Sequence, residues 1–268
     1  MKILMIGNSF CYYFVEELYG MAKAVGLEFE ICNVYYSGCS LEKHWKWLVE
    51  GASNYERIYL TNSEGRNLTE GKNLPYALEL RDWDVISLQA GSPQYIYEKE
   101  DTVRIGEPYI GNLYQYLREK FPNAKYYWHH TWSSQIGYRH LTDPNNVVLD
   151  KEEQDKRAEN AAFFADYVCT KYGVKEIPSG PAWQLARQDE RIGDTLTNRV
   201  NSKGEDKTDC HHDGNIGGGR YLNACVWFEV LTGMSCIGNT YVPDYDLSPE
   251  KMKILQEKAH EAVKRKLH

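Results

Sequence analysis

The chain has 268 residues, a net charge of −7 and a pI near 5.7, and 42% of its residues are hydrophobic. These values are ordinary for a globular chain of one large or two small domains, and the acidic balance argues against a nucleic-acid partner. No apolar run is long enough to cross a membrane, and the first one is too short for a secretion signal. We therefore expect a cytoplasmic protein with no membrane partner.

The first residues predict a strand, a tight turn and a helix in immediate succession. A short apolar run ends in Gly7-Asn8-Ser9, and apolar residues then recur at helical spacing. Ser9 would lie where the carboxyl end of a strand meets the start of a helix, which is the rim where open α/β sheets bind ligands. The free N–H groups of such a helix start suit an oxyanion. In a simpler interpretation, Ser9 is only a helix cap.

The rest of the chain alternates between β-type runs and amphipathic segments. Further strands are predicted at residues 28–36, 83–88, 125–130 and 174–177. Further helices are predicted at residues 41–49, 105–120, 152–171, 181–187, 217–231 and 249–266. A hairpin or surface excursion is predicted at residues 55–75, and loops at residues 136–150 and 193–216.

This alternation predicts an α/β fold, a three-layer α/β/α sandwich with a mostly parallel central sheet. No linker or low-complexity tract interrupts the pattern, so residues 1–268 are interpreted as a single domain. The seven cysteines are odd in number and form no Cys-x-x-Cys pair. They indicate reduced thiols rather than disulfides or a zinc site.

Four polar turns, most of them at the ends of predicted strands, contain the groups that acyl transfer by serine requires. That chemistry needs a nucleophile, an imidazole base, a carboxylate that orients the base, and donors for the oxyanion. Ser9 can be the nucleophile, His212 the base and Asp209 the carboxylate. The backbone N–H groups of Ser9 and Gly38 can donate to the oxyanion, because a glycine lets the substrate approach the main chain.

In these residues the chain resembles the SGNH/GDSL hydrolase superfamily, and more closely a branch known only as a domain of unknown function. The first block of that superfamily places a serine directly after the first strand, as in Gly7-Asn8-Ser9-Phe10. The second block is a glycine in the turn after the second strand, as at Gly38. The last is Asp-x-x-His before the final core helix, as in Asp209-Cys210-His211-His212. The resemblance implies the flavodoxin-like SGNH hydrolase fold and a triad of Ser9, His212 and Asp209.

One block departs from the superfamily pattern. After the third strand the superfamily usually carries Gly-x-Asn-Asp, and the asparagine is the third oxyanion donor. This chain has Leu88-Gln89-Ala90-Gly91-Ser92 there. Gln89 offers the same amide on a longer stem, and Ser92 is the alternative donor or a substrate contact. We favour Gln89.

Other side chains are open to two interpretations. The Asp-x-x-His spacing selects His212 as the base, which leaves His211 as a surface residue or a substrate contact. Trp132, at the exit of a predicted strand, either lines an acyl or sugar pocket or packs in the core. Paired histidines at 129–130 and 211–212 raise the question of a metal, but neighbours in a strand point to opposite faces and no carboxylate cluster stands at ligand spacing. No metal is predicted.

The sequence thus predicts a serine esterase that needs no cofactor and acts through an acyl-enzyme. The expected substrate is a short-acyl ester, such as an O-acetyl ester of a carbohydrate or small metabolite. An acyltransferase with the same triad and a non-catalytic carbohydrate-binding relative are the alternatives.

Overall fold

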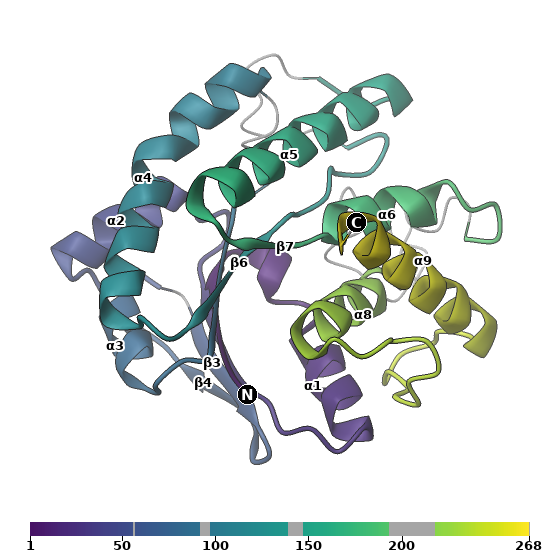
Figure 1. Cartoon of the computed structure of the whole chain (residues 1–268), viewed down its shortest axis with the longest axis horizontal. Helices are drawn as coiled ribbons and strands as arrows, with labels where there is room; N and C mark the ends of the chain where they lie inside the picture. Colours follow the sequence, from purple (N-terminus) through teal and green to yellow (C-terminus); the bar gives the residue numbers. More distant parts are fainter. Residues whose placement is uncertain (56, 92–96, 139–146, 193–217, 268) are drawn as a thin grey trace.

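The protein is described by a computed structural model that covers residues 1–55, 57–91, 97–138, 147–192 and 218–267. The described strands form a seven-stranded sheet in the order β4-β3-β2-β1-β5-β6-β7 (Figure 1). They are β1 (Lys2–Gly7), β2 (Glu30–Tyr35), β3 (Arg57–Asn62), β4 (Gly65–Thr69), β5 (Val85–Gln89), β6 (Lys125–His129) and β7 (Lys175–Ile177). Four neighbouring pairs are parallel: β2 with β1, β1 with β5, β5 with β6, and β6 with β7. The carboxyl ends of β2, β1, β5 and β6 therefore meet at one edge of the sheet.

Helices cover both faces of the sheet (Figure 1). One layer consists of α2 (Leu41–Glu50), α3 (Leu74–Glu79), α4 (Lys99–Lys120) and α5 (Lys151–Tyr172). The other consists of α1 (Val15–Ala24), α6 (Ser179–Arg187), α8 (Gly219–Thr232) and α9 (Pro249–Leu267). Alternate residues of β1 enter the two cores, Leu4 and Ile6 on the first side and Ile3 and Met5 on the second. The predicted three-layer α/β/α sandwich is confirmed.

Residues 55–75 contain a hairpin that widens the sheet. Strand β3 pairs antiparallel with both β2 and β4. The guanidinium of Arg66 on β4 lies over the rings of Tyr12 and Tyr59, at 4.4 and 4.3 Å from their centroids. Arg66 also donates to the backbone oxygen of Tyr12 at 3.3 Å. The hairpin therefore holds the segment that directly follows Ser9.

Three helices differ from the prediction. Helix α1 begins at Val15 rather than Phe10, because the chain first makes a short 3₁₀ turn, η1 (Ser9–Cys11). Helix α4 begins at Lys99, and its charged first turn gives no apolar periodicity that would have indicated its start. Helix α3 was not predicted because it has only 6 residues; the Asn73 side chain caps it by accepting from the Tyr76 N–H at 3.0 Å.

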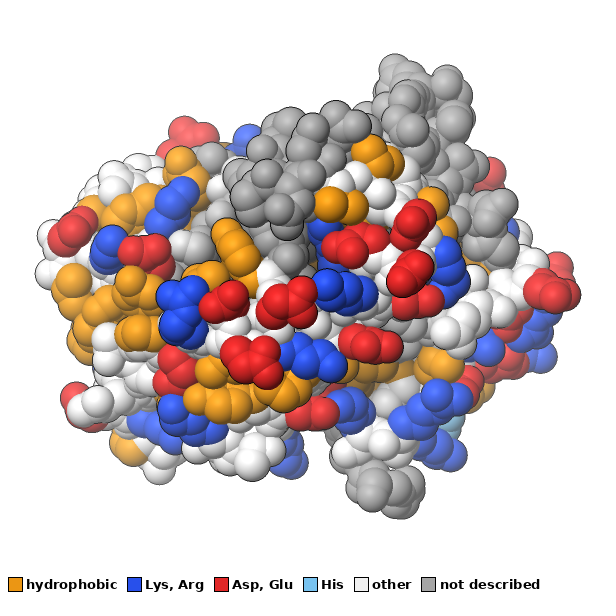
Figure 2. Space-filling model, turned by 90° about the horizontal axis from the view of Figure 1, so that it is seen from above, with side chains coloured by type: hydrophobic (Ala, Val, Ile, Leu, Met, Phe, Trp, Pro, Cys, Tyr) orange, Lys and Arg blue, Asp and Glu red, His pale blue; other side chains and the backbone are white. Residues whose placement is uncertain are grey.

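The surface carries both signs of charge. On the face shown in Figure 2, acidic and basic side chains are interspersed rather than gathered into a patch of one sign. Within the described ranges, no helix combines the length and apolar character that a bilayer crossing requires.

Candidate active site

Ser9 lies at the carboxyl end of β1, as predicted. Strand β1 ends at Gly7, and Asn8 caps η1, its side-chain oxygen accepting from the Phe10 N–H at 3.1 Å. Ser9 is the first residue of this 3₁₀ turn and is 9% exposed. Because the cap is Asn8, the simpler interpretation of Ser9 as a helix cap does not describe this turn.

Asn8 connects the ends of three neighbouring strands. Its Nδ2 donates to the backbone oxygen of Cys39, in the turn after β2, at 3.1 Å. Its Oδ1 accepts from Nε2 of Gln89, at the end of β5, at 2.7 Å. Asn8 is 2% exposed, so water does not compete for these bonds. The Asn8 side chain therefore holds the turn that contains Ser9 against the ends of β2 and β5, the two strands on either side of β1.

Two backbone groups set the orientation of the whole hydrogen-bond chain. The Phe10 N–H can only donate and the Cys39 carbonyl can only accept, which fixes which end of the Asn8 amide is the oxygen. Gln89 must then donate to Asn8 through Nε2, so its Oε1 is left to accept from His129 Nδ1 at 3.2 Å. His129 Nε2 in turn accepts from the Ser179 hydroxyl at 2.9 Å.

His129 is buried and takes part in this chain as a neutral ring. Burial, with a smaller effect from the charge of His130, lowers the pKa of His129 to about 3. A neutral imidazole has one donor and one acceptor nitrogen, which matches the bonds to Gln89 and Ser179. No role for His129 or Ser179 is predicted from the sequence. The alternation of side chains along a strand could have indicated the contact between His129 and Gln89. The two residues pair in register on neighbouring strands, so their side chains lie on the same face of the sheet.

Two glycines make space at the site. Gly7 lets the Gln89 side chain lie across β1, since a Cβ there would stand 2.6 Å from Gln89 Cδ. Gly38 has a φ of 60°, a conformation that favours glycine, and no atom of the described residues lies within 4 Å of a Cβ placed there. Within the described part of the chain, the turn after β2 is thus open on the side where a ligand would approach the main chain.

The sequence matches the family described as a domain of unknown function, DUF4886, over residues 2–262. The chain belongs to the DUF4886 family. A crystal structure of a DUF4886 family protein from Bacteroides uniformis is 30% identical, covers 98% of this chain and 94% of its own, and superposes with a TM-score of 0.80. No curated protein matches the sequence.

More distant structures share the fold of this DUF4886 chain. A candidate SGNH hydrolase from Slackia heliotrinireducens is 17% identical, with 86% of this chain and 98% of that chain covered and a TM-score of 0.50. An acetyl xylan esterase is 11% identical, with 86% and 100% covered and a TM-score of 0.53. The family match confirms the resemblance to a domain of unknown function, and the two distant structures show that the chain shares the fold of an SGNH hydrolase and an esterase.

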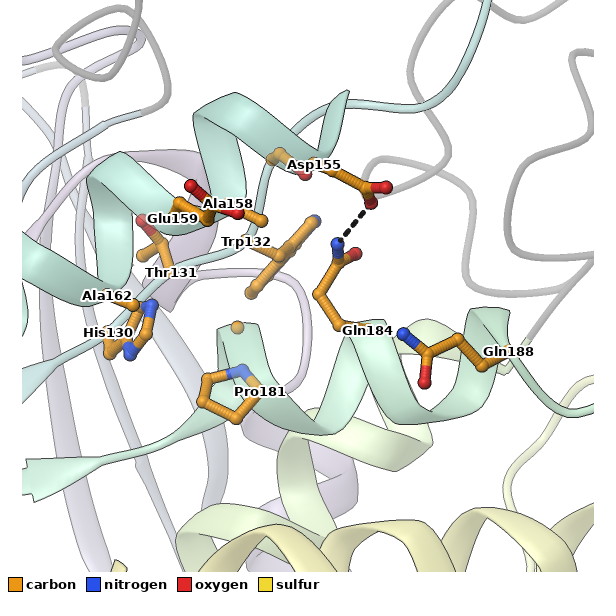
Figure 3. A pocket seen from close by; sticks show the side chains of 12 residues that line it. His130, Thr131, Trp132, Asp155, Ala158, Glu159, Ala162, Pro181, Gln184 and Gln188 are labelled. Atoms are coloured by element: carbon orange, nitrogen blue, oxygen red, sulfur yellow. Dashed lines mark hydrogen bonds between the residues drawn. The ribbon is translucent and has the colours of Figure 1, made fainter. Parts of the chain in front are cut away.

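Trp132 is a buried member of the core in this DUF4886 protein. It is 3% exposed, its ring stacks on Trp183 with centroids 4.7 Å apart, and it meets the ring of Phe10 edge-on at 4.6 Å. It also lines a cavity between α5 and α6 (Figure 3). The residue next to Ser9 is therefore connected to that cavity through one tryptophan.

The remaining predicted site residues lie outside the described part of the chain. These are Ser92, Asp209, His211 and His212. Their roles stay predictions. Among the described residues, no group of three or more His, Cys, Asp or Glu side chains is placed to hold a metal ion.

Proposed function

We propose that this protein is a serine ester hydrolase that acts through an acyl-enzyme on short-acyl esters of carbohydrates or small metabolites. The observation that carries the proposal is the position of Ser9. It lies at the carboxyl end of β1, and Asn8 bonds its turn both to the turn that contains Gly38 and to the Gln89 amide. Nucleophile and candidate oxyanion donors thus come from three adjacent strand ends.

In the proposed reaction, His212 removes the proton from the Ser9 hydroxyl as Oγ attacks the ester carbonyl, and Asp209 orients the imidazole. The tetrahedral oxyanion rests on the N–H groups of Ser9 and Gly38 and on the Gln89 amide. When it collapses, His212 gives its proton to the leaving alcohol. His212 then activates the water that hydrolyses the acyl-enzyme.

The donors have capacity for this role. Among the described residues, the Gly38 N–H has no hydrogen-bond acceptor. Asn8 takes one of the two hydrogens on Gln89 Nε2, and no described residue accepts the second. Because Gln89 is held from both ends by Asn8 and His129, its amide is pre-organised rather than free to rotate.

The acyl group and the alcohol are the finer parts of the proposal. One fold neighbour is named as an acetyl xylan esterase, which supports the proposal of a small acyl group carried by a sugar or another alcohol with several hydroxyl groups. An acyltransferase would use the same three side chains but pass the acyl group to an alcohol instead of water. A binding protein would have no use for the complete set of Ser9, Asp209 and His212.

A hydrolysis screen tests the proposal. The wild type and Ser9→Ala are incubated with p-nitrophenyl acetate, longer p-nitrophenyl esters and acetylated sugars, and products are identified by mass spectrometry. We expect the wild type to release acetate and to prefer acetyl over longer acyl groups, whereas Ser9→Ala should be inactive. Transfer of acetate to an added sugar in preference to water would identify an acyltransferase, and no turnover of any ester would contradict catalysis.

The esterase activity should not depend on a metal ion. None of the steps above needs a Lewis acid, because protein N–H groups stabilise the oxyanion and His212 carries the proton. We expect the rate of p-nitrophenyl acetate hydrolysis to be unchanged after exhaustive EDTA treatment and dialysis. A loss of rate that added zinc restores would show that the paired histidines had been misinterpreted.

A further inference from the structure

A second candidate site lies at the same edge of the sheet as Ser9. An open cavity of about 350 Å³ is lined by α5, by α6 and by the segment that follows β6 (Figure 3). Its volume falls within the range of small-molecule sites. Strand β6 lies two strands from β1, so their ends are about 10 Å apart. The cavity is thus close to Ser9 but has its own walls.

A buried histidine lies at the inner side of this cavity. His130 is 2% exposed, and its Nδ1 lies 2.7 Å from Oε1 of Glu176 on β7. Among the described residues, no hydrogen-bond partner is found for Nε2, the other ring nitrogen. A Cβ at Gly180 would stand only 2.8 Å from Nε2, so the glycine allows the start of α6 to pack this close to the ring, and both residues line the cavity.

The partners of Glu176 determine what His130 offers to the cavity. Lys266 Nζ lies 2.9 Å from Oε2 of Glu176. Burial alone would raise the pKa of Glu176, but the hydrogen bond and the positive charge of His130, together with the charge of Lys266, outweigh it and lower that pKa. An ionised carboxylate can only accept, so Nδ1 of His130 carries a proton and donates to it. Nε2 is the ring nitrogen left for a ligand, and a hydroxyl group, which can both donate and accept, can bond to it.

The walls fit a neutral, hydroxylated ring better than a cation or a metal. Trp132, Pro181 and Ala162 contribute apolar surface to the lining, which suits the C–H face of a sugar. From α6, the Gln184 amide donates to Asp155 at 3.3 Å and Gln188 also lines the cavity, and an amide can both donate to and accept from hydroxyls (Figure 3).

Two carboxylates line the cavity, those of Asp155 and Glu159. Lys151 forms an ion pair with Asp155, so Glu159 is the group that an ammonium ligand would use. Among the described residues, the acidic and imidazole groups here do not gather into a set of three that could bind a metal.

We propose that this cavity binds a hydroxyl-bearing ring, such as one monosaccharide unit, with His130 Nε2 hydrogen-bonded to a ligand hydroxyl. The binding requires no chemistry at Ser9. Only the further step, that the ring belongs to the alcohol part of the ester substrate, rests on the proposed function.

The test uses methyl β-D-xylopyranoside, a sugar without an ester, and nitrogen-detected NMR of the imidazoles. Titration of the wild type and of Ser9→Ala should give the same saturable binding and should shift the Nε2 resonance of His130. Because this result does not depend on turnover, it separates the cavity from the proposed esterase. Absence of saturable binding, or binding that leaves the His130 resonances in place, would overturn the proposal.

Matched variants locate the site. His130→Gln keeps a donor for Glu176 but removes the ring nitrogen Nε2 and should weaken binding about tenfold. His260→Gln is the control, since His260 pairs with Glu229 through Nδ1 at 2.9 Å in a second histidine–glutamate pair, and neither residue lines the cavity. Ala162→Leu fills the cavity from α5 without touching the His130–Glu176 bond and should abolish binding even if His130→Gln does not fold. Binding that survives Ala162→Leu would place the ligand elsewhere.

A cationic ligand is the competing outcome. The same titration with cyclohexylamine, which is an ammonium ion at neutral pH, should give weaker binding than the glycoside. If the amine binds more tightly and Glu159→Gln removes that preference, the cavity is a cation site and the proposal is wrong.

Discussion

Replacing Ser9 by alanine should lower kcat for p-nitrophenyl acetate by roughly 10⁴- to 10⁶-fold, because the acyl-enzyme cannot form without the hydroxyl. The substitution removes one oxygen from a side chain that is 9% exposed, and the Asn8 cap stays in place. Thermal unfolding should therefore be almost unchanged, which separates loss of chemistry from loss of fold.

Ser9 and His212 should act as one unit. His212→Ala should cost about as much as Ser9→Ala, and the double variant little more than either, because each single variant already stops the same step. Steady-state kinetics on all three variants measures this. Clear additivity of the two effects, or an active Ser9→Ala enzyme, would be incompatible with the triad.

The order of strands and helices could be predicted because most elements carry strong local signals. The run before Gly7 is apolar throughout, as expected for a parallel strand buried on both faces, and β1 lies at the centre of the sheet. For residues 55–75 the sequence does not distinguish a hairpin from a surface excursion, because β4 is short, polar and half-exposed. Its place at the sheet edge depends on pairing with β2, which no local pattern encodes.

The start of α1 shows where periodicity misleads. Phe10 and Phe14 fit a helical pattern and are both buried, but Phe10 belongs to η1 and Phe14 directly precedes α1. Apolar spacing reports which side chains face the core, and a 3₁₀ turn followed by a bend can bury the same residues as a helix. The Asn8 side chain caps this 3₁₀ turn and bonds it to Cys39 and Gln89, which are far away in sequence.

The meeting of three candidate site residues at one edge of the sheet could be predicted from the strand ends, but the hydrogen-bond network between them could not. Ser9 follows β1, Gly38 lies in the turn after β2, and Gln89 is the last residue of β5. Because these three strands are neighbours in the sheet, its topology alone brings the three residues together. The link through Asn8, and the support of Gln89 by His129 and Ser179, depends on side chains separated by 81, 40 and 50 positions. Such pairings require the register of the sheet, which the sequence pattern leaves open.

If Gln89 is the third oxyanion donor, the network accounts for a glutamine at the place where the superfamily that this chain resembles has an asparagine. Gln89 is the last residue of β5 and its longer stem folds back over Gly7, so that its amide reaches Asn8 in the nucleophile turn. A side chain of this length has an additional rotatable bond, and the His129 bond removes that freedom. A matched perturbation follows: Ser179→Ala loosens His129 but leaves the amide, and it should reduce kcat by no more than about tenfold.

Gln89→Ala is expected to lower kcat by about 10²–10³-fold with little change in KM, because a donor to the oxyanion gains strength only as charge develops. Gln89→Glu should be at least as poor, since its carboxylate would bring negative charge to the oxyanion and would face Asn8 Oδ1 with no hydrogen to donate. Gly7→Ala should give a similar loss with the amide still present, because its Cβ would displace Gln89. Ser92→Ala is the control and should stay within about tenfold of the wild type. If Ser92→Ala is the crippled enzyme while Gln89→Ala turns over normally, the third donor is Ser92, and the bond between Gln89 and Asn8 serves only to hold the turn.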